Sequence, residues 1–150
     1  MRLDNGLYVQ LADVGNDMVA GFGCCRAYRY AATLPTGHYV VTLERGEARG
    51  ALVISPVTGA AVEMVDVPRP DPADPATVVP VASSDMLGYR AEIWRLTDGA
   101  WARTYACDHL PYGAAFSRWE AGRVVLTVPA DRDPEREFSF SAAGPSCKGG

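Results

Sequence analysis

Apolar residues recur at every second position along most of this chain, in short segments that glycine, proline, asparagine and aspartate interrupt. This period is typical of half-buried β-strands, and the interruptions are typical of turns. No segment has the periodicity of a helix of three turns, and the best helical candidate is a turn near residues 83–88, capped by Ser83 or Ser84. The pattern predicts an all-β, antiparallel barrel or sandwich of about ten short strands.

Turn residues divide the chain into the expected strands and hairpins. We expect strands at residues 7–12, 19–31, 38–44, 49–55, 60–67, 76–82, 89–97, 100–107, 114–120, 123–128 and 136–141. Asp98-Gly99 is a favoured pair for a two-residue type I′ hairpin, because both positions need a positive φ. Ala121-Gly122 and Arg45-Gly46-Glu47 indicate two further hairpins, and residues 56–59 indicate another turn.

Four prolines fall within residues 68–75. Such a segment excludes a helix or a central strand, so we expect an extended surface loop of polyproline II character. As a linker it would leave two halves of roughly 70 residues each, near the lower limit for a stable core. We therefore expect one domain spanning residues 1–150.

Charge and hydropathy narrow the class of partner. The 150-residue chain has a formal net charge of -4, which argues against nucleic acid as a partner. No apolar run approaches the length of a membrane-spanning helix. An acidic protein is attracted to basic surfaces, so the expected partner is a protein with a basic surface.

Pairing the strands outward from Asp98-Gly99 predicts which side chains share a face. One predicted face contains Glu92, Trp94, Leu96, Trp101, Arg103, Tyr105 and Cys107. Tryptophan, tyrosine and arginine are enriched at binding hot spots. The candidate partner-binding residues are therefore the exposed members of Glu92, Trp94, Trp101, Arg103 and Tyr105. In the alternative interpretation, the aromatic residues are core and Arg103 pairs with Glu92 at its edge.

The same alternation predicts the faces of two other regions. Around Ala121-Gly122, the expected core face is Ala115, Ser117, Trp119, Val124, Leu126 and Val128. The opposite face, with Phe116, Arg118, Glu120, Arg123, Val125 and Thr127, is expected to face solvent. In the strand at 38–44, we expect Tyr39, Val41 and Leu43 inside, and His38, Thr42 and Glu44 outside.

The four cysteines, Cys24, Cys25, Cys107 and Cys147, are candidates for two disulfides. Adjacent cysteines on a strand point to opposite faces, so each of the first two can meet a different partner. We expect Cys107 to pair with Cys24 or Cys25, in a periplasmic or secreted protein. The N-terminus has no apolar targeting segment, although a mature chain lacking its signal peptide would start the same way. Four reduced thiols would instead indicate the cytoplasm.

No spacing predicts catalysis, a metal site or a cofactor. His38 and His109 are the only histidines, and neither lies in a metal-binding pattern. Cys107-Asp108-His109 combines a thiol, a carboxylate and an imidazole, but neighbouring side chains on a strand point apart. The acidic segments 13–17 and 131–135 lack the calcium-loop pattern, and no phosphate-binding loop is present. We therefore expect no catalytic residues, metal ligands or cofactors.

These observations favour a non-enzymatic binding protein. One concrete version is a protein inhibitor or immunity-type protein that neutralises a bacterial toxin or enzyme. This version follows from the class of small acidic β-proteins and from no motif. Two alternatives remain open: a small-ligand carrier with a β-barrel cavity, and a hydrolase with dispersed catalytic residues.

Overall fold

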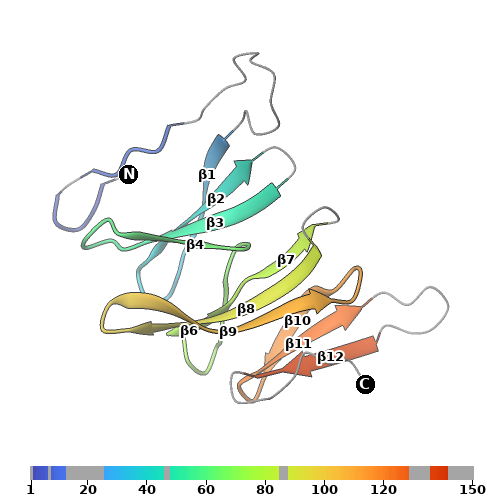
Figure 1. Ribbon diagram of the computed structural model, residues 1–150. Helices are drawn as coiled ribbons and strands as arrows, with labels where there is room; N and C mark the ends of the chain where they lie inside the picture. Colours follow the sequence, from blue (N-terminus) through green and yellow to red (C-terminus); the bar gives the residue numbers. More distant parts are fainter. Residues whose placement is uncertain are drawn as a thin grey trace, which may run out of the picture. The chain divides into compact units, whose positions relative to one another are not determined.

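Figure 1 shows the computed structural model of the chain, in which the described strands form three antiparallel sheets. The structure describes residues 2–6, 8–12, 26–45, 48–84, 88–128 and 136–141, and these contain no helix. The chain is all-β, as predicted. Contacts divide it into two compact units, Met1–Pro68 and Arg69–Gly150. The single-domain organisation stays a prediction.

The first unit contains a four-stranded sheet in the order β1-β2-β3-β4. Its strands are β1 (Arg26–Thr33), β2 (Tyr39–Arg45), β3 (Ala48–Ile54) and β4 (Ala61–Met64). The predicted β2–β3 hairpin is confirmed, and its register is unbroken from Arg45↔Ala48 to Tyr39↔Ile54.

Strand β2 lies between two neighbours in this sheet. Val41 and Leu43 are buried as alternation predicts, and Val40 on the opposite face is buried too. The prediction that His38 points outward is wrong, because its side chain is only 6% exposed. The loop before β2 holds this residue, since the amide of Leu34 donates to the carbonyl of His38 at 2.8 Å.

The N-terminal segment packs against the turn that follows β3. The amide of Asp4 donates to the carbonyl of Pro56 at 2.8 Å, and Leu3 is buried. Gly59 has φ +75°, and a Cβ there would lie 3.0 Å from Cδ1 of Leu3. The predicted strand at 7–12 is wrong for the described residues 8–12, where an isolated bridge between Arg2 and Tyr8 takes its place.

The second unit contains a five-stranded sheet and a three-stranded sheet. The larger one comprises β5 (Arg69–Pro70), β6 (Thr77–Val79), β7 (Val81–Ser84), β8 (Gly88–Thr97) and β9 (Ala100–Leu110). The smaller one comprises β10 (Ala115–Glu120), β11 (Arg123–Val128) and β12 (Arg136–Phe140). Ser83 and Ser84 belong to β7, and residues 85–87 of the expected helical turn lie outside the described ranges.

Both sheets of the second unit contribute to one hydrophobic core. Its buried members are Val79, Val81, Ala91, Ile93, Cys107, Leu110, Ala114, Val124, Leu126 and Phe140. No sheet closes into a barrel within the described residues, so the sandwich is the alternative that fits.

The proline-rich segment is more structured than the expected extended loop. Its first part is the edge strand β5, in which Pro70 pairs with Val78 of β6. The chain then turns, and the carboxylate of Asp74 accepts hydrogen bonds from the Thr77 hydroxyl at 2.8 Å and the Ala76 amide at 3.3 Å. An edge strand tolerates proline because one side of it needs no amide donor.

Two hairpin tips lie where the sequence places them. Asp98 and Gly99 have φ values of 51° and 79°, and Ala121 and Gly122 have values of 48° and 73°. Positive φ at both central residues is the geometry of a type I′ turn, so both predictions are confirmed.

The predicted faces of β10 hold only near its turn. Val124 and Leu126 are fully buried, and Trp119 packs against the core as expected. The register shifts between Phe116 and Arg118. Beyond this shift Phe116 packs against the core, whereas the expected core residues Ala115 and Ser117 are exposed. The predicted outward position of Val125 is also wrong, because it is buried in the central strand of the sheet.

Candidate binding face on strands β8 and β9

A β-bulge interrupts the hairpin on which the candidate residues lie. Trp94 pairs with Arg103 as predicted, but the next pair is Ile93 with Tyr105. Thr104 is therefore the extra residue, and its hydroxyl donates to the carbonyl of Ile93 at 3.1 Å. An extra residue reverses the faces of everything beyond it on that strand.

The bulge removes Tyr105 from the predicted face. Tyr105 packs against the core of the second unit, and its ring stacks on Phe140 with centroids 5.8 Å apart. Cys107 pairs with Ala91 on the same core side. The prediction that Tyr105 shares a face with Glu92 and Arg103 is therefore wrong.

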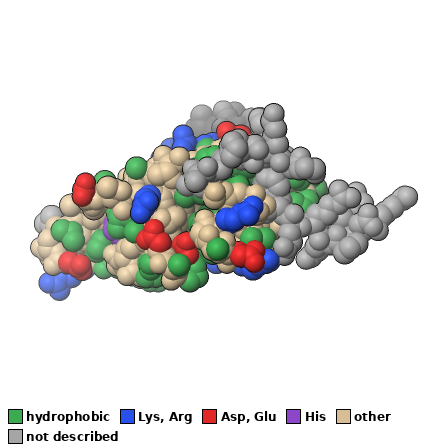
Figure 2. Space-filling view, turned by 90° about the horizontal axis from the view of Figure 1, so that it is seen from below, with side chains coloured by type: hydrophobic (Ala, Val, Ile, Leu, Met, Phe, Trp, Pro, Cys, Tyr) green, Lys and Arg blue, Asp and Glu red, His purple; other side chains and the backbone are tan. Residues whose placement is uncertain are grey.

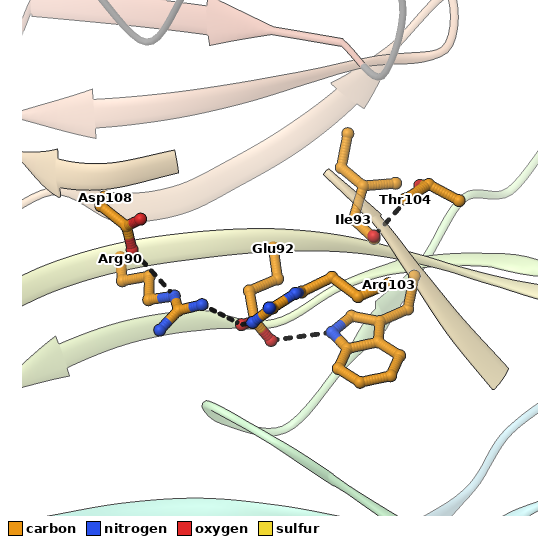
Figure 3. Close-up of polar contacts among 7 residues, drawn as sticks. Arg90, Glu92, Ile93, Arg103, Thr104 and Asp108 are labelled. Atoms are coloured by element: carbon orange, nitrogen blue, oxygen red, sulfur yellow. Dashed lines mark hydrogen bonds and ion pairs between the residues drawn. The ribbon is translucent and has the colours of Figure 1, made fainter. Parts of the chain in front are cut away.

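The carboxylate of Glu92 is the centre of the remaining candidate residues (Figure 3). Its side chain is almost completely buried, at 3% exposure. Oε1 accepts a hydrogen bond from Nη1 of Arg103 at 2.7 Å, and Nη2 of Arg90 lies 2.8 Å from the same oxygen. Oε2 accepts from Nε1 of Trp94 at 2.8 Å. A buried carboxylate needs such partners, and here they fix three side chains of one face.

Arg90 extends this network to a second acidic residue. Its Nε lies 3.0 Å from Oδ1 of Asp108, so the order of charges is Asp108, Arg90, Glu92 and Arg103. We call these four residues the charged strip (Figure 3). The side chains at its ends are exposed, by 56% for Asp108 and 47% for Arg103.

Exposure reduces the set of predicted contact residues. Arg103 is exposed and Trp94 is partly exposed, whereas Trp101 is buried. Glu92 is too deeply buried to form much of a contact surface, but its carboxylate positions both Trp94 and Arg103. The predicted Arg103–Glu92 pair is thus present, and the exposed part of the predicted site is Trp94 with Arg103.

Sequence reasoning missed Arg90 and the contact of Asp108. Arg90 lies two positions before Glu92, so alternation alone could have placed both on one face. Strict alternation along the predicted strand places Asp108 on the face opposite Arg103. Counting outward from the pairs Ile93↔Tyr105 and Ala91↔Cys107 places Arg90 opposite Asp108, so this contact depends on the bulge at Thr104.

The residues with catalytic potential in the sequence fall in both units of the chain. His38 lies in the first unit, where its Nδ1 is 3.1 Å from the Thr36 hydroxyl. Burial lowers the pKa of His38, and a hydrogen bond with the backbone of Thr36 opposes this shift. His109 belongs to β9, but its side chain lies outside the described set. Among the described residues, no cluster of His, Cys, Asp and Glu side chains could hold a metal ion.

The cysteine pairing stays a prediction. Cys107 is fully buried on β9. Cys24, Cys25 and Cys147 lie outside the described residues, as do the acidic segments 13–17 and 131–135.

Across the described ranges, no helix is long and apolar enough to cross a membrane. Comparisons of the chain with protein-family models, with curated proteins and with solved structures find no match. Function must therefore be argued from the site alone.

Proposed function

We propose that this chain is a non-enzymatic binding protein that contacts a protein partner through Trp94 and Arg103. The observation that carries the proposal is the buried carboxylate of Glu92, which bonds both of these side chains. Side chains that are fixed before binding lose little conformational freedom on binding. Tryptophan and arginine are also the side chains that most often dominate binding energy.

The guanidinium of Arg103 has nitrogen donors that can form hydrogen bonds with a partner. Nη1 is engaged by Glu92, and no described residue accepts a hydrogen bond from its other nitrogens. These donors suit a carboxylate or a backbone carbonyl. Trp94, which pairs with Arg103 across the two strands, adds partly exposed apolar area beside them.

The charge expected of the partner depends on the net charge of the chain, which acts at long range, and on the individual charges of the face, which act on contact. Acidic and basic side chains are interspersed over the face in Figure 2, and the charged strip itself contains two of each sign. The net charge of -4 still favours encounter with a basic protein surface at long range. Arg103 would then contact an acceptor group within that surface.

The inhibitor or immunity-type role remains the concrete version of this proposal, with a bacterial toxin or enzyme as target. Its support is the small acidic β-rich chain and the pre-positioned arginine and tryptophan. A carrier with a barrel cavity has less support, because no described sheet closes. A hydrolase would need His38 or His109 beside a Cys, Asp or Glu in a cleft. The proposed disulfides would place the protein outside the cytoplasm. Alkylation of the unreduced, denatured protein, followed by intact mass measurement, counts the free thiols and so tests for these disulfides.

The experiment is affinity capture from lysate of the native host, followed by measurement of the captured partner's affinity. Arg103→Ala is expected to weaken binding by roughly 1–3 kcal/mol, or about 5- to 150-fold, while the protein stays folded. The matched control is Arg118→Ala, because Arg118 is 43% exposed and also pairs with a glutamate, Glu120. Equal affinities of the two variants, or no partner that native protein captures reproducibly, would refute the proposal.

A further inference from the structure

The charged strip has ends of opposite sign. Glu92 and Arg90 lie inside it and contact charges on both sides. Asp108 and Arg103 are its two ends. Each pairs with one neighbouring charge of the strip, and the side chain of each is about half exposed. The strip therefore presents an accessible negative charge at one end and an accessible positive charge at the other.

The two ends belong to the same strand. Arg103 and Asp108 lie on β9, equally distant along the sequence from the Tyr105–Ala106 peptide bond. β9 forms a border of the described five-stranded sheet, where it pairs with β8. A two-fold axis near this peptide bond would bring Arg103 of one copy beside Asp108 of the other, and the same contact would form a second time.

We propose that the charged strip is a self-association surface, which a second copy of this chain binds about a two-fold axis. Such an interface is isologous, because one patch supplies both halves of every contact. A second copy is favoured over another partner because the complement of each exposed end is the other end of the same strip. Trp94, fixed by Glu92 on this face, would add partly exposed apolar area to the contact.

The physical character of the contact predicts a weak, salt-sensitive dimer. Ion pairs between exposed side chains contribute little individually, and salt screens them. The inference does not rest on the proposed function, since it uses only the charges of the strip. The two are linked in one respect: a dimer would cover Arg103, so self-association and partner binding through this face would exclude each other.

The test is sedimentation equilibrium of the full chain over a wide concentration range, at about 0.05 M and about 0.5 M salt. We expect a reversible monomer–dimer equilibrium that is weaker at the higher salt concentration. Asp108→Arg turns both reciprocal contacts into repulsions, so it should raise the dimer dissociation constant about tenfold or more. The matched control is Glu120→Arg, because Glu120 is similarly exposed but lies outside the strip.

A charge exchange sharpens the test. Combining Asp108→Arg with Arg103→Glu restores opposite charges across the axis and should return the dissociation constant to near the native value. Since Arg103→Glu places a carboxylate beside Glu92, thermal unfolding first shows whether the double variant folds. If it does not fold, the comparison of Asp108→Arg with Glu120→Arg decides. A native chain that stays monomeric, an assembly larger than a dimer, or equal effects of these two variants would overturn the inference.

Discussion

The β2–β3 hairpin keeps one register along its whole length, whereas the β8–β9 hairpin shifts its register twice. In the regular hairpin, Val41 and Leu43 lie two positions apart and are both buried. In the shifted hairpin, Arg103 and Tyr105 are also two positions apart, yet one is exposed and the other packs into the core. The extra residue Thr104 accounts for this difference.

The contrast shows how one strand can serve a core and a surface site. A strand without a bulge must continue the same alternation, so Arg103 would share its face with Tyr105 and Cys107. With the bulge, the first part of β9 directs Arg103 toward Glu92, and the later part contributes Cys107 to the core. The bulge therefore separates a stabilising segment from a candidate binding segment.

The largest expected effect comes from truncating the ring that the bulge turns inward. Tyr105→Ala should destabilise the protein by roughly 2–3 kcal/mol, because a partly buried aromatic ring loses its packing against the core. The matched control is Tyr30→Ala, since Tyr30 is 65% exposed and should cost well below about 1 kcal/mol. Urea unfolding measures both. Similar losses for the two variants would mean that β9 alternates without a bulge.

A smaller effect is expected at the tip of the same hairpin. Gly99→Val should lower the free energy of unfolding by about 1 kcal/mol or more, because a β-branched residue resists positive φ. No atom lies within 4 Å of a Cβ built at Gly99, so the cost measures backbone strain and not crowding. Thr97→Val, at an exposed position next to the turn, is the control and should change stability little. An unchanged urea midpoint for Gly99→Val would contradict the type I′ geometry.

The smallest effect is a pH dependence that reports on the loop leading into the regular hairpin. Burial lowers the pKa of His38 below its ordinary value of 6.5 in the folded chain. Below that value the unfolded chain binds the proton more readily, so stability should be highest above pH 6.5 and fall as the solution becomes more acidic. Replacing His38 with glutamine should flatten this part of the profile, measured by urea unfolding at several pH values. A profile identical to that of the native chain would show that His38 is not the responsible group.

Local chemistry explains which parts of the fold were predictable. Asp98-Gly99 and Ala121-Gly122 specify their own turns, and the pairs nearest each turn follow from them. The bulges at Thr104 and Ser117 were not predictable in this way, because tertiary packing selects them: each lets a ring, Tyr105 or Phe116, reach the core.

In the candidate site too, some contacts follow from the turn and others depend on the bulge. Trp94 and Arg103 were predictable because they lie between the turn and the bulge, and Glu92 because the extra residue is on β9 and leaves the alternation along β8 unchanged. The contact of Arg90 with Asp108 lies beyond the bulge at Thr104, so alternation counted from the turn could not find it. The burial of His38 depends on the conformation of the loop before β2, which no periodicity describes.

Pro70 in strand β5 has a consequence for how this protein behaves at high concentration. The border of a sheet is a template on which chains can aggregate, since an incoming strand can continue its hydrogen-bond ladder. At β5 an incoming strand could pair with only two residues, and one of them, Pro70, has no amide hydrogen to donate. This border is therefore a poor starting point for fibrous growth, and the proline protects solubility while it completes the sheet.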